Sequence, residues 1–241
     1  MTLRARAIVA TLAATLAVVA GPAQAQSSLS VVAGANRASL TFDPPIRDVY
    51  AEAFGFDAAS SGVNTLAAGM FFERLFGGRP GVRIEGLFSQ AGTRIEGSAN
   101  NVPLPSTARA TSFGINGADY AFEEKIRLSM LEVPVMVVFP LGIDHKVRLM
   151  GGGFVAHHLS QTERFRETVG GESRNINLDR DHQAQMKSTH FGIALGAEIN
   201  LTRRVGVGGR FNLGLTNIDD EDDFDSIKMR ILRVYVVIRV K

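Results

Sequence analysis

The stretch HFGIALGAEINL, residues 190–201, decides the fold class, because apolar residues alternate along it with glycine, alanine and polar residues. One face of an extended segment here carries Phe191, Ile193, Leu195, Ala197, Ile199 and Leu201, and the other carries His190, Gly192, Ala194, Gly196, Glu198 and Asn200. A two-residue period is typical of a β-strand whose faces meet different surroundings. After a short connection, residues 205–217 (VGVGGRFNLGLTN) repeat the pattern. The two stretches therefore predict an antiparallel hairpin with one apolar face.

Segments of about ten residues with this alternation, rich in Val, Ile, Phe and Gly, recur along the chain. We predict eight strands, at residues 29–37, 63–74, 82–97, 126–139, 147–161, 187–201, 205–217 and 227–240. Pro134 lies inside one of them and lacks a ladder donor, so we expect a β-bulge there. No apolar run long enough for a membrane-spanning helix, about 20 residues, occurs beyond the N-terminal segment. The predicted fold class is therefore all-β.

Short and long connections alternate between the predicted strands. The short ones are residues 75–81, 140–146 and 202–204, and the long ones are residues 37–62, 98–125, 162–186 and 218–226. Tight turns at one end and longer loops at the other are typical of bacterial membrane barrels, whose tilted strands need about ten residues to cross the hydrocarbon. We therefore predict a closed antiparallel up-and-down transmembrane β-barrel of about eight strands, with both termini in the periplasm. A soluble β-sandwich or a lipocalin-like barrel is the alternative.

The strand faces opposite to the apolar ones are rich in small residues and carry few charges. The charged residues on them are Arg83, Glu85, Glu132, Arg148, Glu198, Arg210, Arg233 and Arg239. The lumen of an eight-stranded barrel is filled by its side chains, and an unpaired charge in such a space is costly. We therefore predict that these residues form a structural network of Glu–Arg pairs in the lumen, which plugs the barrel and makes a wide pore improbable.

The N-terminal segment has the layout of a secretory signal peptide. Arg4 and Arg6 precede an apolar run at residues 7–20, and Ala23-Gln24-Ala25 follows with small residues at the two positions that a signal peptidase reads. The run is too short for the alternative, a membrane-spanning anchor. We therefore predict a cleavable signal peptide at residues 1–25 and one β-barrel domain at residues 26–241, located in the outer membrane of a Gram-negative bacterium.

The composition of the chain limits the bound groups and the kinds of partner that can be expected. The chain has no cysteine, so the exported protein has no disulfide and no zinc site built from thiolates. Arg4 and Arg6 lie in the signal peptide, and the other 24 of the 26 Lys and Arg residues balance the 24 Asp and Glu residues. No basic stripe is interleaved with aromatic residues, so nothing indicates a nucleic-acid partner.

Four stretches of the predicted strands are motifs that can be compared with a known family. They are LEVPVMVVF at residues 131–139, GGGF at 151–154, FGIALGAE at 191–198 and RFNLGLTNI at 210–218. They resemble the fourth to seventh strands of the outer membrane protein β-barrel domain family, whose PorT-like members carry LEIPLLL, a glycine-rich stretch, FG…GAG.E and RYSLGLTNI there. The resemblance covers nearly all of the mature chain and implies an outer-membrane barrel of about eight antiparallel strands, without implying a reaction.

No constellation specifies a metal, a cofactor or a catalytic residue. The acidic run at residues 219–225 offers oxygen ligands to a divalent cation, but it lacks the spacing of a calcium loop and equally fits a solvated loop. His158 and His190 can both face the lumen, as metal ligands or as two ordinary hydrogen-bonded histidines. Ser160 lies near His158, but no spacing marks a nucleophile and its base. We therefore expect no metal, no cofactor and no enzyme activity.

The expected role is structural or adhesive, or one in envelope integrity. In this role the barrel anchors long external loops, with residues 98–112 and 163–187 as contact surfaces. Two other function classes stay open, namely a narrow channel or transporter for small solutes and an outer-membrane lipid-modifying enzyme. The expected partners are outer-membrane lipid, lipopolysaccharide and the barrel insertion machinery, and we expect a monomer.

Overall fold

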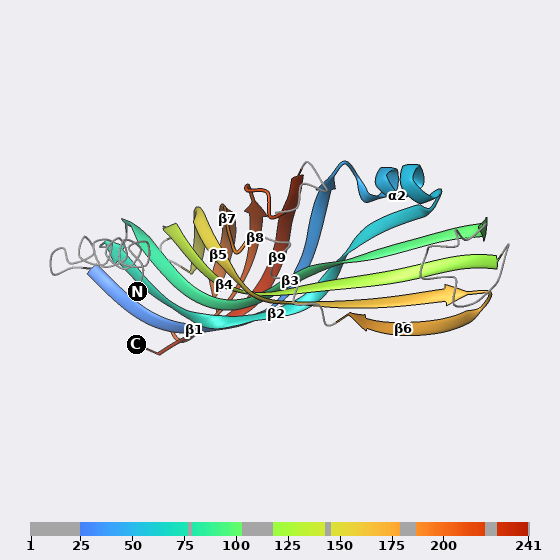
Figure 1. Ribbon diagram of the computed structural model, residues 1–241. Coiled ribbons are helices and arrows are strands. Elements are labelled where there is room, and N and C mark those ends of the chain that lie inside the picture. The colour runs from blue at the N-terminus through green and yellow to red at the C-terminus, as the bar shows by residue number, and fades with distance from the viewer. Residues whose placement is uncertain are drawn as a thin grey trace, which may run out of the picture.

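The computed structural model describes residues 25–76, 79–102, 118–142, 146–178, 187–219 and 226–240, which fold into nine strands and one helix (Figure 1). The strands are β1 (Ala25–Asp43), β2 (Asp57–Phe76), β3 (Arg79–Val102), β4 (Ala118–Leu141), β5 (Val147–Val169), β6 (Glu172–Leu178), β7 (Thr189–Asn200), β8 (Val205–Gly214) and β9 (Ser226–Arg239). The helix is α2 (Ile46–Phe54). The predicted signal peptide lies outside the described residues, apart from Ala25.

Eight of these strands close into a ring. In the order β1, β2, β3, β4, β5, β7, β8, β9 each strand pairs antiparallel with the next, and β9 pairs with β1. Strand β6 lies outside the ring, because β7 pairs with residues 147–157 of β5 whereas β6 pairs with residues 163–169. A closed ring leaves no unpaired strand edge, as a membrane barrel requires. The predicted closed antiparallel barrel of about eight strands is therefore confirmed.

Strands β2 to β5 continue well past the ring. They contain 20 to 24 residues, against 10 to 14 in β7, β8 and β9. With β6 they form the outer sheet, residues 57–62, 93–102, 118–128 and 160–178, which reaches away from the start of β1 and the end of β9 (Figure 1).

Most described residues of the three longest predicted loops, at residues 37–62, 98–125 and 162–186, are therefore strand or helix, and the prediction of loops there is wrong. The alternation is hidden in much of these segments because both faces of the strands carry polar residues, as Glu163 and Arg164 of β5 illustrate.

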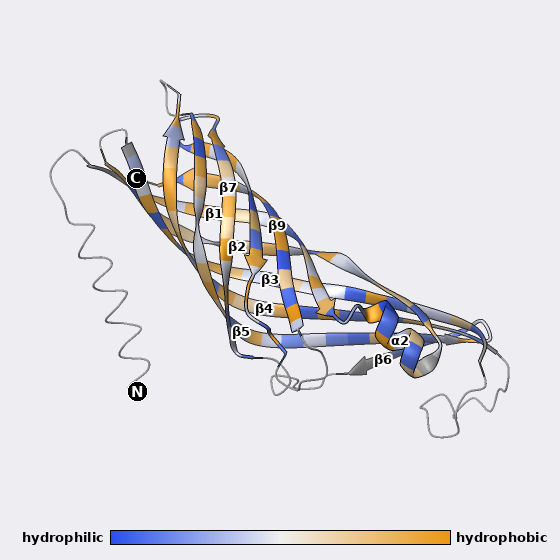
Figure 2. Ribbon diagram, turned by 90° about the horizontal axis from the view of Figure 1, so that it is seen from above, coloured by the Kyte–Doolittle hydropathy of each residue, from blue (hydrophilic) through white to orange (hydrophobic). Residues whose placement is uncertain are grey.

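The polarity of the strand faces reverses along β4. From Leu131 to Phe139 the outward side chains are apolar, and Glu132 is fully buried inside. Beyond Ser129 the buried side chains include Phe122, Ile126 and Leu128, and the outward ones are Glu123, Lys125 and Arg127. Hydrocarbon around the barrel and water around the outer sheet explain both arrangements. In Figure 2 orange predominates on the barrel strands, and blue becomes frequent toward the outer sheet.

Neighbouring strands change polarity at the same height. Strand pairing places Gln90 opposite Ser129 and Ser129 opposite Ser160. Arg37 of β1 is opposite Asn64 of β2, and its Nη1 donates to Asn64 Oδ1 at 3.3 Å. Arg37, Asn64, Gln90 and Ser129 are each the first polar outward residue beyond the apolar band of their strand, whereas in β5 the outward His157, opposite Leu131, precedes Ser160. We call these five residues the polar edge and take it as the outer limit of the hydrocarbon.

Helix α2 lies on one face of the outer sheet (Figure 1). Tyr50 of the helix stacks on Phe122 of β4 with ring centroids 5.2 Å apart, and the neighbouring Phe56 stacks on Tyr120 at 5.3 Å. The helix ends at Gly55, whose φ of +69° suits a residue without a Cβ. No helix in the described residues has the length and apolarity needed to span a bilayer.

Strand β5 contains a bulge at Leu159, where its register with β4 shifts beyond Ser129. The extra residue moves the inward positions of β5 from even to odd numbers. The predicted bulge at Pro134 is wrong, because β4 keeps its register with both neighbours there. Pro134 instead leaves a gap in the pairing of β4 with β3, as a residue without a backbone N–H does.

Replacing Val236 with arginine tests the position of the hydrocarbon band. Val236 is exposed on the outward face of β9, in the middle of the apolar run from Leu232 to Val240. An arginine at the bilayer midplane costs about 2–4 kcal/mol. Val236→Arg should lower the free energy of unfolding by that amount, as measured by urea titration in lipid vesicles. Thr41→Arg, on the outward face of β1 beyond the polar edge, is the control and should change it by less than about 0.5 kcal/mol. Equal losses would contradict the assigned band.

Candidate functional site in the barrel interior

Arg83 holds together a group of ion pairs inside the barrel. Its Nε donates to Glu73 Oε2 at 2.8 Å, and its Nη1 donates to Glu198 Oε2 at 2.9 Å. Its guanidinium carbon lies 3.9 Å from the ring centroid of Phe71, so the flat face of the cation is covered as well. The side chain is inaccessible to water. A cation at this depth is stable only with its carboxylates in place, because its desolvation costs several kcal/mol.

The same two carboxylates bind arginines nearer the end of the barrel at which β1 begins and β9 ends. Arg148 Nη1 donates to Glu73 Oε1. Arg239 Nη2 donates to Glu198 Oε1 at 2.6 Å and to Asn200 Oδ1 at 2.5 Å. Each carboxylate therefore joins guanidinium groups that come from different strands.

Glu85 extends this group toward the outer sheet. Arg210 Nη1 donates to Glu85 Oε2 at 2.6 Å, and Arg83 Nη1 lies 3.8 Å from Glu85 Oε1. Tyr235 fills the space beside them. Its ring lies so close to Gly208 that a Cβ there would come within 2.6 Å of Tyr235 Cζ. Glycine at position 208 is what leaves room for an aromatic ring in a narrow lumen.

A second group, centred on Glu132, lies farther toward the outer sheet. Arg233 Nη2 donates to Glu132 Oε1 at 2.9 Å, and Asn212 Nδ2 donates to Glu132 Oε2 at 3.2 Å. Arg233 Nε donates to Asn36 Oδ1 at 2.7 Å, and its Nη2 also donates to Ser89 Oγ at 2.8 Å. These five side chains come from five strands, so the group ties the ring together across its interior.

The structure brings the eight charged residues singled out from the sequence into these two groups. Arg83, Glu85, Arg148, Glu198, Arg210 and Arg239 are in the first group, and Glu132 and Arg233 are in the second. Glu73 also belongs to the first group, but it was not predicted from the sequence. A signal was present, because Glu73 and Arg83 are directly opposite across the turn between β2 and β3.

Beyond the Glu132 group the interior is mainly apolar. Its buried side chains include Ala38, Leu40, Leu128, Met130, Phe154, Ile218, Met229 and Ile231. The ring of His190 lies among them, with its centroid 5.9 Å from that of Phe154 and 5.0 Å from that of His158. Neither ring nitrogen of His190 has a hydrogen-bond partner in the described part of the chain. The interior is thus packed by ion pairs in one half and by apolar side chains in the other.

Two carboxyl groups face each other beyond the polar edge. Glu124 of β4 and Glu163 of β5 share a hydrogen bond. Burial, and then the charge of Glu163, raises the pKa of Glu124 to about 7. Burial, and then the charge of Glu124, likewise raises the pKa of Tyr50 in α2 to about 12. Burial in the outer sheet therefore favours the protonated form of Glu124.

The other candidate residues do not assemble into a second site in the described residues. No group of three or more His, Asp or Glu side chains there is arranged to hold a metal ion. Ser160 is exposed at the polar edge, whereas His158 is turned to the interior, because the bulge at Leu159 separates them. Asp219 is buried, and its N–H donates to Asn217 Oδ1 at 3.0 Å. The rest of the acidic run, residues 220–225, lies outside the described residues.

A family model described as "Outer membrane protein beta-barrel domain" matches residues 23–220, a range that includes every strand from β1 to β8. No curated protein matches the chain.

Among solved structures, Neisserial surface protein A (NspA) aligns with a TM-score of 0.42 and 10% identity, covering 88% of this chain and 98% of that one. Ail, the attachment invasion locus protein of Yersinia pestis, aligns with a TM-score of 0.41 and 12% identity, covering 89% and 99%. OprG from Pseudomonas aeruginosa aligns with a TM-score of 0.27 and 13% identity, covering 89% and 93%.

Removing one partner of a buried pair should cost more than removing both. Glu85→Leu leaves the guanidinium of Arg210 without its carboxylate and should lower the free energy of unfolding in lipid vesicles by about 3–5 kcal/mol. Adding Arg210→Met should recover most of that loss, because no unpaired charge then remains at this position. Glu96→Leu, at an exposed position in the outer sheet, is the control. A double variant as unstable as Glu85→Leu would contradict the pairing.

The outer sheet should loosen as the pH rises through about 7. The pKa of Glu124 is higher in the folded protein than its ordinary value of 4.5, so its contribution to stability is complete below about pH 4.5 and is lost as the pH passes about 7. Amide exchange of α2 and outer β4, corrected for the intrinsic rate, should therefore be several-fold faster at pH 8.5 than at pH 5. Glu124→Gln should abolish this difference, and Glu123→Gln, its outward neighbour, should keep it. A difference that persists in Glu124→Gln would assign it to other groups.

Proposed function

The chain belongs to the outer membrane protein β-barrel domain family and lies in the outer membrane, and on this premise we propose that it is a closed anchor for the outer sheet. In this proposal the barrel conducts no solute. The outer sheet is held at the cell surface, where it makes adhesive contacts or contacts that strengthen the envelope. Short turns mark the periplasmic end of such barrels, so the outer sheet is on the extracellular side.

The packed interior is the observation that carries the proposal. Side chains that would line a pore have no contact with water, as the zero exposure of Arg83, Glu132 and Glu198 illustrates. Their charges are neutralised by each other at hydrogen-bonding distance. Farther out, apolar side chains such as Met130 and Ile231 occupy the lumen. A narrow channel for solutes therefore receives no support from the interior.

The outer sheet supports a contact role. Four ring strands and β6 extend it beyond the polar edge, and α2 covers one of its faces while the other has no described element on it. An extended sheet of this kind is a rigid platform, which suits a surface for binding better than a flexible loop does. An enzyme is less well supported, since Ser160 and His158 lie on opposite sides of the barrel wall.

The apolar band supports a monomer surrounded by lipid. Every strand of the ring contributes exposed apolar side chains to it. Examples, one from each strand, are Val31, Met70, Phe88, Val135, Leu149, Leu195, Phe211 and Val236. No part of the outer surface of the described ring strands differs in polarity in a way that would indicate contact with a second subunit. The apolar band therefore favours lipid on all sides of the barrel.

Conductance in planar bilayers tests the closed state. The purified protein should give no single-channel steps under conditions in which a porin does. A variant in which a two-residue turn replaces residues 98–121 should stay silent as well, because the packed interior is intact in it. Cells that express this variant should lose the attachment to protein-coated surfaces, or the envelope resistance to detergent, that the full chain confers. A mobility change on boiling before electrophoresis confirms that each protein is folded. Regular current steps from the full chain would overturn the proposal.

A further inference from the structure

Three cations stand directly side by side on the outward face of the outer sheet. Strand pairing places Arg94 of β3 opposite Lys125 of β4, and Lys125 opposite Arg164 of β5. Arg127 lies on the same face of β4, two residues nearer the polar edge. Like charges in directly opposed positions destabilise a sheet. We call these four residues the cation row, and their mutual repulsion favours the binding of an anion there.

Acidic neighbours neutralise the row only at one end. Arg94 Nε lies 3.2 Å from Glu123 Oε1, and Arg94 Nη1 lies 3.4 Å from Glu96 Oε1. Among the described residues no carboxylate is within ion-pair distance of Lys125, Arg127 or Arg164.

Electrostatics at Lys125 agree with this imbalance. Burial, and then the charges of Arg127, Arg94 and Arg164, lowers the pKa of Lys125, although Glu123 acts in the opposite direction. A positive potential therefore remains at the centre of the row.

The height of the row matches the phosphate level of a membrane. Arg127 and Lys125 are two and four residues beyond Ser129, the residue of β4 in the polar edge. At about 3.4 Å per residue and a tilt of about 40°, they lie roughly 5 and 10 Å outside the hydrocarbon. The headgroup region of a leaflet is about 5–8 Å thick. Long side chains at these positions reach phosphate groups at its outer boundary.

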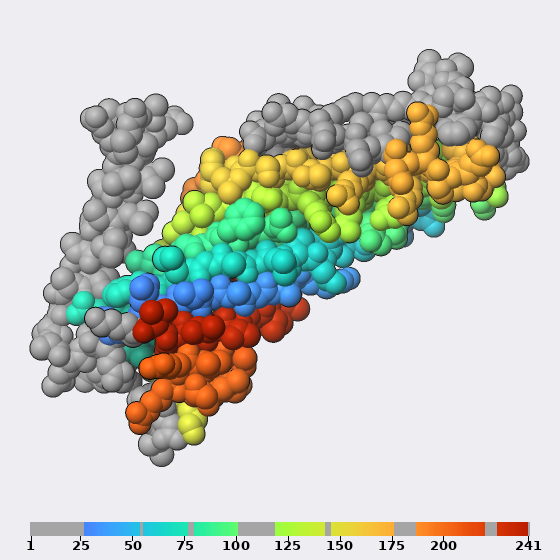
Figure 3. Space-filling view, turned by 90° about the horizontal axis from the view of Figure 1, so that it is seen from below, coloured from blue at the N-terminus to red at the C-terminus, as the bar shows by residue number. Residues whose placement is uncertain are grey.

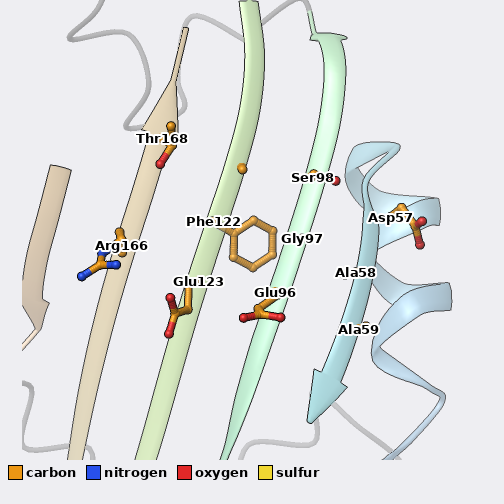
Figure 4. A pocket seen from close by; sticks show the side chains of 11 residues that line it. Asp57, Ala58, Ala59, Glu96, Gly97, Ser98, Phe122, Glu123, Arg166 and Thr168 are labelled. Atoms are coloured by element: carbon orange, nitrogen blue, oxygen red, sulfur yellow. The ribbon is translucent and has the colours of Figure 1, made fainter. Parts of the chain in front are cut away.

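The surface beyond the row suits sugar hydroxyls. Figure 3, seen from the side opposite to α2, shows β3, β4 and β5 side by side on this face. A hollow of about 400 Å³ lies next to the row, floored by small residues such as Ala59, Gly97 and Ala121. Figure 4 shows Glu96, Glu123 and Arg166 around it on neighbouring strands. Carboxylate and guanidinium groups are hydrogen-bond partners for hydroxyls.

We propose that Arg94, Lys125, Arg127 and Arg164 bind phosphate groups of lipopolysaccharide in the outer leaflet, with headgroup sugar in the adjoining hollow. Lipopolysaccharide fits better than a phospholipid, because it carries sugar and phosphate together at the height of the row. The row faces away from α2 and lies just outside the hydrocarbon, where such a lipid packs against the barrel. The inference rests on the outer-membrane location and does not depend on whether the barrel is closed.

Binding of purified lipopolysaccharide to the full chain in phosphatidylcholine nanodiscs tests the site. The double variant Lys125→Gln/Arg164→Gln should bind about thirtyfold more weakly at low salt, since each cation near a charged lipid surface contributes roughly one kcal/mol. Arg203→Gln, an exposed cation in the turn at the opposite end of the barrel, is the matched control and should bind like the unchanged protein. Arg127→Gln alone should give about a fivefold loss by the same reasoning.

The ligand itself supplies the second control. Lipopolysaccharide from which the phosphates have been removed should bind the unchanged protein as weakly as the intact lipid binds the double variant. Equal binding of the two lipids would overturn the proposal, and so would equal binding to the double variant and the unchanged protein. The proposal would also be overturned if the protein bound phosphatidylglycerol or a soluble sulfated glycan more tightly than lipopolysaccharide, because the cation row would then bind another anion.

Discussion

Hydrocarbon on the outside of the barrel is the constraint on which the rest of the structure depends. It requires ring closure, because lipid cannot hydrate the backbone groups of a free strand edge. It also leaves the interior as the place for charged side chains of the ring strands. Arg83 illustrates the consequence, since it is inaccessible to water and is held by Glu73 and Glu198 from two other strands. Ion pairing inside the barrel therefore follows from the lipid outside it.

Contact with hydrocarbon ends at the polar edge, and the distribution of apolar and charged side chains between the two strand faces changes there. Ser129 is outward at this height, and beyond it apolar side chains move to the inner face while charged ones move outward. Irregular strand pairing occurs at the same height. The bulge at Leu159 adjoins Ser160, and the register of β2 and β3 shifts between Gly62 and Ala67, around Asn64. Bulges that change which residues face inward are placed where the surroundings of the strands change.

The part of the fold inside the hydrocarbon could be predicted from the sequence, because lipid enforces strict alternation there. Residues 190–201 show it, and Glu198 and Arg210 could be placed in the lumen for the same reason. Much of the outer sheet could not be predicted, since water tolerates polar residues on both faces of a strand and hides the period, as at Glu163 and Arg164. Glu73 was missed because its importance comes from the residue opposite it, Arg83, and pairing across a turn depends on a register that composition does not specify.

Charged side chains have different roles on the two sides of the polar edge, because hydrocarbon surrounds the barrel and water surrounds the outer sheet. In the interior an arginine without a carboxylate is too costly to keep, so Arg83, Arg210 and Arg233 each have one within hydrogen-bonding distance. Their charges are neutralised by carboxylates within the barrel. Outside the hydrocarbon, water lowers the cost of an unpaired cation, so Lys125 and Arg164 can stand opposite each other without a carboxylate between them. A charge that the fold does not neutralise is free to attract a ligand. Charges inside the barrel of this protein therefore serve structure, and those just outside the membrane are the ones suited to recognition.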